Sequence, residues 1–503
     1  MNRIKLFFIF VNCVTSLSWT QNYGNIQKEV LAIKSHTAPL KFESAPTELL
    51  KIYSGSPEFV SIDIQIESKL YRLELLKHSI LADNFSQIVT NKVTTVSVMN
   101  TSNTLHYRGM VNEDEKAFAT LTLSKDEIYI SLVLQDQNIQ LVKSKNSNEF
   151  AVASDLNLAS SLIKCGVADN QAIDSFPPTS AFHKQICPIR FMWVTNYDYY
   201  YYQGTMIYAL FGDVDAIYYQ EGVDIELGTL KSTAGNPYTG FSTFNAFIDF
   251  GNYLQSDSDF LGHDLATFID LVPSLGSDYS GFGVIDALCT TFSNNPNNPK
   301  GRHAFCRVLY ANPSDPNYQF TSNYISSLRT VVHEIGHNLG SRHTHWCGWP
   351  GGAIDNCSAV EPDDFGFTCA SGPFPASGGT IMSYCNSTSS NVLFNGFGIY
   401  PNATIVDKIA SKSNCICSGA GIEDVESNMD FELFPNPIQE GVELSVGSSV
   451  DMVFDCIKIY DLNNKLLLTT FYESSVKVDK LMKGVYIVIA EKDGKSWSAK
   501  FIR

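Results

Sequence analysis

The fold and the chemistry are decided by one stretch, Val331-Val-His-Glu-Ile-Gly-His-Asn-Leu-Gly-Ser-Arg-His343. Around it, apolar residues recur at intervals of three and four, at Ile325, Leu328, Val332, Ile335 and Leu339, which predicts a helix. At about 100° per residue these five share one arc, and His333 and His337 point roughly 120–160° away from its centre. One side of the helix therefore suits a core and the other suits a cleft.

The histidines of this stretch have the spacing of metal ligands. His333 and His337 lie one helical turn apart, so both imidazoles can reach a single ion. Gly340 should end the helix because glycine accepts the left-handed cap conformation, and His343 can then return as a third ligand. Three neutral imidazoles leave a fourth tetrahedral position open, which is typical of catalytic Zn²⁺.

Glu334 is the predicted general base of this site. A water molecule in the open position has its pKa lowered towards 7, and the adjacent carboxylate can take its proton and pass it to a leaving amine. The alternative is a helix that carries these residues by chance. Five fixed residues scanned over this length would match by chance about once in 10⁴ such sequences.

The pattern H-E-x-x-H-x-x-G-x-x-H resembles the zinc signature of the metzincin metalloproteases. That family has a methionine-containing turn downstream, and Gly379-Thr-Ile-Met-Ser-Tyr-Cys385 resembles it, which places Met382 beneath the zinc. A lone methionine would more often fill a core. Tyr384 matches the Met-x-Tyr of astacins and serralysins, which implies a tyrosine that binds zinc and steadies the oxyanion. Reprolysins generally lack it.

Length and charge limit the classes of function. A chain of 503 residues suggests about three domains, and 44% hydrophobic residues suffice for sizeable cores. The net charge of −17 argues against nucleic acid as a partner. Carboxylates are available for Ca²⁺, but the sequence assigns no ligands for it.

The N-terminus reads as a secretory signal peptide over residues 1–20. Arg3 and Lys5 precede a short apolar run that is too short to span a membrane, and no other segment has eighteen consecutive apolar residues. Cysteines in an exported chain favour disulfides. Nine of the twelve gather around the zinc motif, an odd number that leaves one free or paired elsewhere: Cys187, Cys289, Cys306, Cys347, Cys357, Cys369, Cys385, Cys415 and Cys417.

Residues 21–180 predict a β-rich region. Apolar and polar residues alternate over residues 60–66, 117–123 and 128–134. Residues 105–111 are similar to propeptides of the reprolysin (adamalysin-like) branch of metzincins. Lys164-Cys-Gly-Val-Ala-Asp169 resembles the cysteine switch of matrixin and reprolysin zymogens, which implies that Cys165 occupies the open zinc position. The alternative is a propeptide cysteine that forms a disulfide.

Residues 181–418 predict an α/β domain. Residues 187–194, 223–230, 264–271 and 281–289 read as strands, and residues 244–254 read as a helix. The order resembles the catalytic domain of reprolysins, which implies a mixed sheet with an active-site helix. Many reprolysins have Asp where Thr344 stands. His345 is expected to lie in a loop or behind a ligand, and His183 and His303 are expected on the surface. The cysteine-rich residues 348–379 should form a wall of the substrate cleft.

The C-terminal part follows a polar linker at residues 419–430. Short alternating strands over residues 431–503, with Phe434-Pro-Asn-Pro437 at the start, imply a small β-sandwich. This part is similar to the C-terminal sorting domains of the bacterial type IX secretion system, which implies contact with that machinery and a secreted or cell-surface location. The alternative is an unrelated β adhesion module.

Together these features predict a multidomain secreted zinc endopeptidase that acts on proteins or peptides. It is expected to be a monomer and to be made as a latent precursor. A competing interpretation is a secreted binding or adhesion protein that keeps zinc without activity. A third is zinc-dependent hydrolysis of a non-protein bond. Glu334 favours the protease, because inactive relatives usually lose this residue.

Overall fold

The computed structural model divides into two compact units, residues 23–421 and a second that includes residues 422–503, and each is considered by itself. The structure describes residues 30–36, 38–42, 46–66, 68–90, 95–99, 104–112, 114–143, 150–154, 165, 187–196, 204–233, 235–272, 278–293, 300–309, 323–385, 392–416, 432–434, 443–447, 454, 456–460, 466–470, 474–479, 481, 485–492 and 495–503. The predicted signal peptide, the predicted linker and His183 lie outside these residues.

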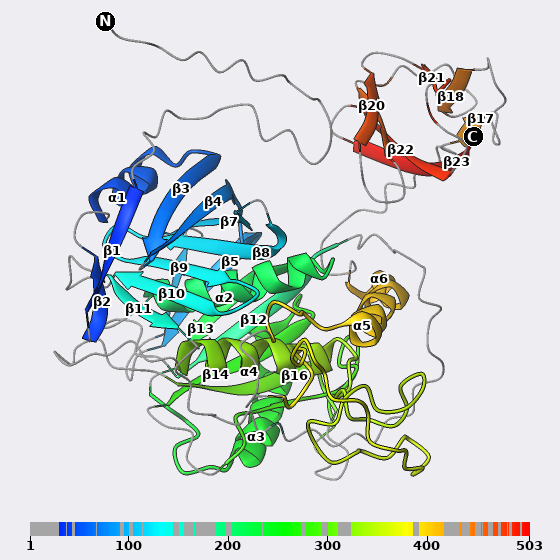
Figure 1. The fold of residues 1–503 in the computed structure, drawn as a ribbon. Helices are drawn as coiled ribbons and strands as arrows, with labels where there is room; N and C mark the ends of the chain where they lie inside the picture. The colour runs from blue at the N-terminus through cyan, green and yellow to red at the C-terminus, as the bar shows by residue number, and fades with distance from the viewer. Residues whose placement is uncertain are drawn as a thin grey trace, which may run out of the picture. The chain divides into compact units, whose positions relative to one another are not determined.

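The N-terminal region is β-rich, as predicted (Figure 1). Its nine-stranded sheet has the order β11-β10-β9-β8-β7-β4-β3-β1-β2. The strands are β1 (Val30–His36), β2 (Ala38–Phe42), β3 (Phe59–Ile66), β4 (Lys69–Lys77), β7 (Leu105–Val111), β8 (Asp114–Leu123), β9 (Ile128–Val133), β10 (Asn138–Lys143) and β11 (Ala151–Ser154), and helix α1 is Pro46–Gly55. Alternate residues of β3 and β4 enter one buried apolar cluster, which explains the period of two in the sequence.

The second sheet has seven strands in the order β15-β16-β14-β12-β13-β5-β6. Its strands are β5 (Leu81–Thr90), β6 (Thr95–Met99), β12 (Ile189–Thr195), β13 (Ile225–Ser232), β14 (Leu265–Val272), β15 (Gly281–Gly283) and β16 (His303–Leu309). The pairs from β16 to β5 are parallel, and the edge strands β15 and β6 are antiparallel to their neighbours. The predicted mixed sheet is thus present.

Two strands of this sheet come from the N-terminal region. Strand β5 pairs with β13 in parallel, with Leu230 beside Gln87, and the hydroxyls of Ser86 and Thr229 lie 2.8 Å apart. Strand β6 then pairs with β5. The N-terminal region therefore extends the sheet against which the zinc-motif helix packs, which the sequence did not suggest.

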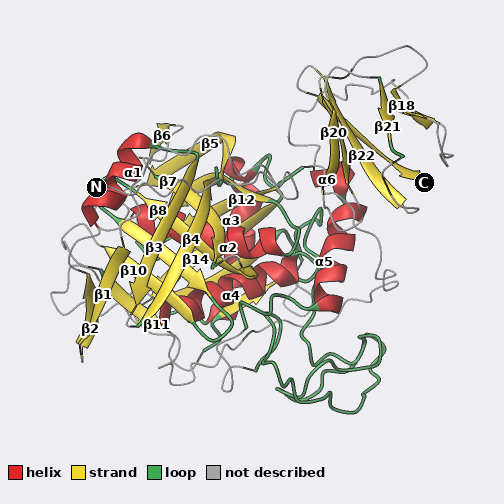
Figure 2. Ribbon diagram, turned by 45° about the horizontal axis from the view of Figure 1, so that its top comes forward, coloured by secondary structure: helices red, strands yellow, loops and turns green. Residues whose placement is uncertain are grey.

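Helices cover both faces of the second sheet (Figure 2). They are α2 (Gly204–Gln220), α3 (Thr243–Ser256), α4 (Asn323–Asn338), α5 (Ile399–Ser411) and the short α6 (Ser413–Ile416). Phe282 of β15 stacks on Phe247 of α3, whereas Gly281 and Gly283 face Glu334 of α4. Neighbouring residues of a strand point to opposite faces, so α3 and α4 lie on opposite sides of the sheet.

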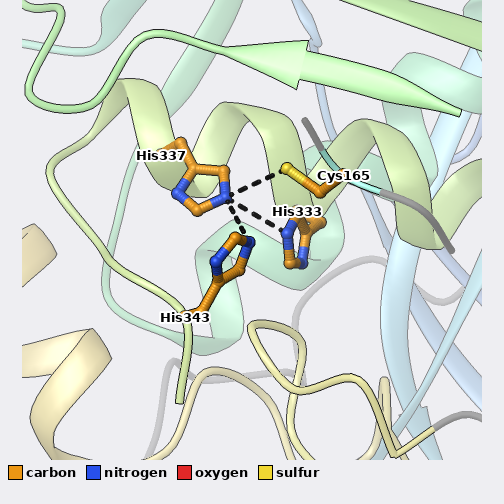
Figure 3. Close-up of side chains that lie close together, drawn as sticks. All are labelled: Cys165, His333, His337 and His343. Atoms are coloured by element: carbon orange, nitrogen blue, oxygen red, sulfur yellow. Dashed lines mark hydrogen bonds between the residues drawn. The ribbon is translucent and has the colours of Figure 1, made fainter. Parts of the chain in front are cut away.

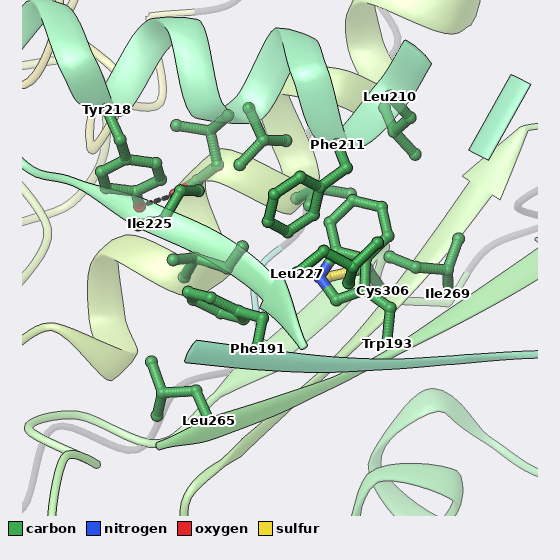
Figure 4. Packing of buried hydrophobic residues seen from close by; sticks show 14 of the residues in the cluster. Phe191, Trp193, Leu210, Phe211, Tyr218, Ile225, Leu227, Leu265, Ile269 and Cys306 are labelled. Atoms are coloured by element: carbon green, nitrogen blue, oxygen red, sulfur yellow. Dashed lines mark hydrogen bonds between the residues drawn. The ribbon is translucent and has the colours of Figure 1, made fainter. Parts of the chain in front are cut away.

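Helix α2 lies on the same side as α4 and also contacts β7, β8 and β9 of the first sheet. The Tyr218 hydroxyl donates to the Val332 carbonyl at 2.8 Å, which joins α2 to α4. Figure 4 shows the core between α2 and the second sheet, where Trp193 of β12 meets Phe211 edge to face. The zinc-motif helix is thus held against a large apolar core.

Two local predictions in this unit are wrong. The expected strand over residues 281–289 ends at Gly283, because Asp286 and Cys289 take positive φ values and the Asp286 amide donates to the His337 carbonyl. His303 is not a surface residue. It begins β16, is buried, and stacks on Phe247. No motif surrounds His303 in the sequence, so the sequence could not show that these neighbours bury it.

Disulfides gather around the zinc motif as predicted. They join Cys289 to Cys415, Cys347 to Cys369 and Cys357 to Cys385, and Cys187 is also disulfide-bonded. Cys306 is buried and free.

Within the described parts of the chain, no helix is long and apolar enough to span a bilayer.

The C-terminal unit consists of two small sheets, with the orders β17-β18-β21 and β20-β19-β22-β23. The strands are β17 (Glu432–Phe434), β18 (Glu443–Gly447), β19 (Cys456–Tyr460), β20 (Leu466–Thr470), β21 (Ser475–Lys477), β22 (Val485–Lys492) and β23 (Lys495–Ile502). Leu444 of β18 and Val488 of β22 belong to one buried cluster. The predicted C-terminal β-strands are present, and the sandwich arrangement stays a prediction.

Candidate metal centre

The predicted active-site helix is α4, and it ends where the sequence indicated. Gly340 has φ of 104°, a conformation that favours glycine, and its amide donates to the His337 carbonyl at 2.8 Å. A Cβ at this position would lie 2.8 Å from Cγ of Lys408 on α5. The chain therefore turns tightly here, and the turn brings His343 back towards α4.

The three histidines converge on one point (Figure 3). His337 Nε2 lies 3.2 Å from His333 Nε2 and 3.2 Å from His343 Nε2. All three side chains are buried. Burial and the neighbouring His343 imidazole lower the pKa of His333 and of His337 well below the ordinary value, so both stay neutral, as metal ligands must.

The other nitrogen of each ring fixes its tautomer. Nδ1 of His333 lies 2.8 Å from the Ile381 carbonyl, and Nδ1 of His337 lies 2.8 Å from the Ser341 carbonyl. Nδ1 of His343 lies 2.9 Å from Glu361 Oε1. Carbonyls and carboxylates only accept hydrogen bonds, so each Nδ1 carries the proton.

The three Nε2 atoms therefore face each other as lone pairs with no proton between them. Such a cluster is repulsive unless a cation lies at its centre. Tetrahedral zinc with Zn–N bonds of about 2.0–2.1 Å separates its nitrogen ligands by about 3.3 Å, close to the 3.2 Å found here. The donor set thus fits zinc.

Cys165 and Glu334 complete the surroundings of this cluster. Cys165 Sγ lies 3.4 Å from His337 Nε2 and 3.4 Å from Glu334 Oε2. A zinc–thiolate bond of about 2.3 Å would give a sulfur–nitrogen distance of about 3.5 Å. The sulfur therefore stands where a fourth ligand of the same ion would stand.

Glu334 is buried against β15, where Gly281 leaves room for it: a Cβ there would lie 2.6 Å from Glu334 Cγ. Burial raises the pKa of Glu334 to about 8, and the Cys165 contact opposes this rise. Among the described residues, Glu334 Oε1 has no hydrogen-bond partner. The raised pKa means that Glu334 holds a proton more tightly than an ordinary carboxyl group, which is the property of a stronger base.

Met382 and Tyr384 both lie near the histidines. Met382 is buried under α4, and a Cβ on Gly336 would lie 2.8 Å from its sulfur. The Tyr384 hydroxyl lies 3.2 Å from His343 Nε2 and donates to the Cys165 carbonyl at 3.3 Å. The structure thus brings together all seven residues that the sequence singled out.

Glu361 was not expected at this site from the sequence. It lies in the irregular stretch between Gly348 and Gly379, where no periodicity shows which side chains meet. His345 lies behind His343, which is one of the two positions expected for it. Its Nε2 is 2.9 Å from Glu361 Oε1, the oxygen that His343 Nδ1 also contacts. The only sequence feature that could have pointed to Glu361 is the acidic run from Glu361 to Asp364, which lies between Cys357 and Cys369.

Two family models match parts of this chain. The family model for "Metallo-peptidase family M12B Reprolysin-like" matches residues 205–344, which include the three histidines, and that for "Secretion system C-terminal sorting domain" matches residues 432–503. Among solved structures, metalloproteinase-II from Bacteroides fragilis is similar at 14% identity, over 72% of this chain and 95% of that chain, with a TM-score of 0.40. No curated protein matched.

The metal-ligand geometry and the two matched domains lead to one assignment. The chain carries a reprolysin-like M12B metallopeptidase domain and a type IX sorting domain, and it is a zinc metalloendopeptidase that is secreted or displayed at the cell surface.

Proposed function

We propose that the enzyme is made as a latent precursor, that His333, His337 and His343 are its zinc ligands, and that Glu334 is its general base. The convergence of three unprotonated Nε2 atoms beside a buried carboxylate is the observation that carries this proposal. Its substrates would be proteins or peptides. We extend the proposal to residues 21–180 as propeptide, 181–418 as catalytic domain and 431–503 as a β-sandwich, with the protein acting as a monomer.

Zinc held by these histidines would supply Lewis-acid chemistry to the scissile carbonyl and to the attacking water. Glu334 would accept the water proton and deliver it to the leaving amine, a role that needs an acceptor within hydrogen-bond reach of the attacking position. Oε2 is 3.4 Å from the Cys165 sulfur, which occupies the place that water would need. The apolar surroundings of Glu334 favour taking up a proton during the reaction.

Met382 and Tyr384 would have supporting roles. Met382 would form the floor beneath the ligands, and the preceding Ile381 carbonyl would orient His333. The Tyr384 hydroxyl, which donates to the Cys165 carbonyl, would donate to the substrate oxyanion once that segment has left. Reprolysins generally lack such a tyrosine.

Cys165 would keep the precursor inactive. Its sulfur, 3.4 Å from His337 Nε2, would fill the fourth position. Its backbone pairs with Gly281 at the edge of the sheet, and its carbonyl accepts a hydrogen bond from the Tyr384 hydroxyl. These three contacts of Cys165 would exclude the attacking water, cover the edge of the sheet and occupy the Tyr384 hydroxyl. Removal of this segment would be required for full activity.

The substitution Glu334→Gln tests the proposal. The purified precursor is cut with an added protease, that protease is inhibited, and zinc content and kcat/KM on a peptide substrate are measured. We expect zinc to be retained and kcat/KM to fall by about 10²–10⁴, because the general base is lost. The control is Glu221→Gln. Glu221 is another carboxyl group whose pKa is raised by burial, to about 7, so this variant makes the same chemical change at a second buried site.

A zinc-loaded Glu334→Gln enzyme with near wild-type activity would contradict the proposal. The alternative, a zinc-containing adhesion protein without protease activity, predicts no hydrolysis by the processed wild type and unchanged binding by the variant.

A further inference from the structure

The imidazole of His343 is held differently from those of the other two histidines. His333 and His337 donate from Nδ1 to backbone carbonyls, whereas His343 donates to the side-chain carboxylate of Glu361. Hydrogen bonds to an ionised acceptor are about twice as strong as those between neutral groups. A carboxylate behind a ligating imidazole fixes the tautomer and raises the basicity of the opposite nitrogen.

His345 adds a second restraint on the same ring. Its Nε2 lies 2.9 Å from Glu361 Oε1, the oxygen that His343 Nδ1 also contacts. The His343 and His345 rings stack with centroids 5.0 Å apart and an interplanar angle of 7°. Both imidazoles are buried, so the shared oxygen and the stack hold the His343 ring in one plane.

Glu361 is itself tied to the chain that surrounds His343. Its amide donates to the His345 carbonyl at 2.9 Å, and its carbonyl accepts from the Cys347 amide at 2.8 Å. Three residues later, Asp364 pairs with the buried guanidinium of Arg342 at 2.8 Å. The segment 361–364 therefore contacts the residue before His343, its imidazole and the residues that follow.

We propose that Glu361 is a positioning residue for the metal centre, and that it fixes the tautomer and plane of His343 while His345 braces the ring. Glu361 would not touch the ion or the substrate. The proposal rests on the zinc ligands proposed above, and it assigns to the irregular cysteine-rich loop a role in metal retention as well as in the cleft wall.

The test measures zinc retention rather than activity. Full-length wild type, Glu361→Ala, Glu361→Gln, His345→Phe and Asp363→Asn are loaded with zinc. The rate of zinc transfer to a chelator, the apparent zinc affinity by chelator competition and the zinc stoichiometry are measured. Asp363→Asn is the matched control, because the Asp363 side chain lies in the same loop and accepts hydrogen bonds from the Phe365 and Phe367 amides.

We expect zinc affinity to fall about 10–100-fold in Glu361→Ala and by less in Glu361→Gln, whose amide oxygen still accepts a hydrogen bond. His345→Phe keeps the stack but loses the contact with Glu361, so its zinc affinity should fall by less than that of Glu361→Ala. Asp363→Asn should match the wild type. If Glu361→Ala does not fold, the isosteric Glu361→Gln is used instead, and it should transfer zinc to the chelator faster than the wild type does.

Zinc affinity in both Glu361 variants within about twofold of wild type would overturn the proposal. It would also be overturned if the wild type bound two zinc ions and Glu361→Ala bound one, because His343, His345 and Glu361 would then be ligands of a second ion. A wild type that binds no zinc would instead contradict the proposed function itself.

Discussion

At the scale of single residues, the chemistry of this protein depends on which atoms carry protons. Each of the three Nδ1 atoms carries the ring proton and donates it in a hydrogen bond to an oxygen, so each Nε2 keeps a lone pair for a metal. The sequence identified these histidines, Glu334, Met382, Tyr384 and Cys165 because their spacing is regular or matches a motif. It could not identify Glu361, since contacts made by an irregular loop have no period.

Tyr384→Phe should separate oxyanion stabilisation from metal binding. If the hydroxyl donates to the oxyanion, kcat of the processed enzyme should fall about 10²-fold with little change in KM, while zinc content stays the same. Steady-state kinetics with metal analysis would measure this. Tyr400→Phe on α5 is the control, and a kcat equal to wild type would remove Tyr384 from the mechanism.

At the scale of elements, α4 and the turn after it were predictable and strand β15 was only partly so. The apolar period and the glycine stop are local properties, which the sequence contains in full. The early end of β15 depends on the Asp286 amide bonding to the end of α4 and on a disulfide from Cys289 to Cys415, 126 residues away. Contacts of that kind have no local signal.

Gly340→Ala tests the turn that returns His343 to the helix. The positive φ and the approach of Lys408 should make this change cost about 2–3 kcal/mol in the free energy of unfolding, and zinc affinity should fall as well. Urea unfolding would measure it. Gly222→Ala is the matched control, because Gly222 also has a positive φ but has no atom within 4 Å of the added Cβ.

Gly222→Ala should cost about 1 kcal/mol and leave zinc affinity unchanged. Equal losses of stability and unaltered zinc affinity in both variants would show that the turn at Gly340 does not position His343.

At the scale of the whole unit formed by residues 23–421, the N-terminal region and the protease share a sheet and a buried polar interface. Asp213 of α2 accepts hydrogen bonds from Thr120 and Ser131 of the first sheet and from Tyr324 of α4. Strand β5 completes the edge of β13. The alternating pattern predicted strands in this region, but such a pattern does not identify the partner strand.

This interface should weaken in acid because of His106. Burial lowers its pKa to about 3, with His78 adding to the effect, and its Nδ1 lies 2.9 Å from the Thr122 hydroxyl. The folded state keeps His106 neutral while the unfolded chain binds a proton below about pH 6.5. Stability from this residue is therefore lost as the pH falls from about 6.5 towards 3, by about 2 kcal/mol at pH 5.

A comparison of wild type with His106→Gln isolates the contribution of His106 to the pH dependence of stability. The difference between their free energies of unfolding should change by about 2 kcal/mol between pH 7 and pH 5 in urea titrations. Thr122→Val removes the hydrogen bond but keeps the histidine, so it should retain the wild-type pH dependence. A His106→Gln variant with the same pH dependence as wild type would contradict the assignment.

In the proposed precursor, three imidazoles and one thiolate surround a single zinc ion. X-ray absorption at the zinc edge of the purified precursor tests it most directly. We expect one zinc per chain with three nitrogen neighbours at about 2.0–2.1 Å and one sulfur at about 2.3 Å, and no sulfur in Cys165→Ala, whose precursor should be more active than the wild-type precursor. Absence of zinc, or a sulfur neighbour that persists in Cys165→Ala, would contradict it.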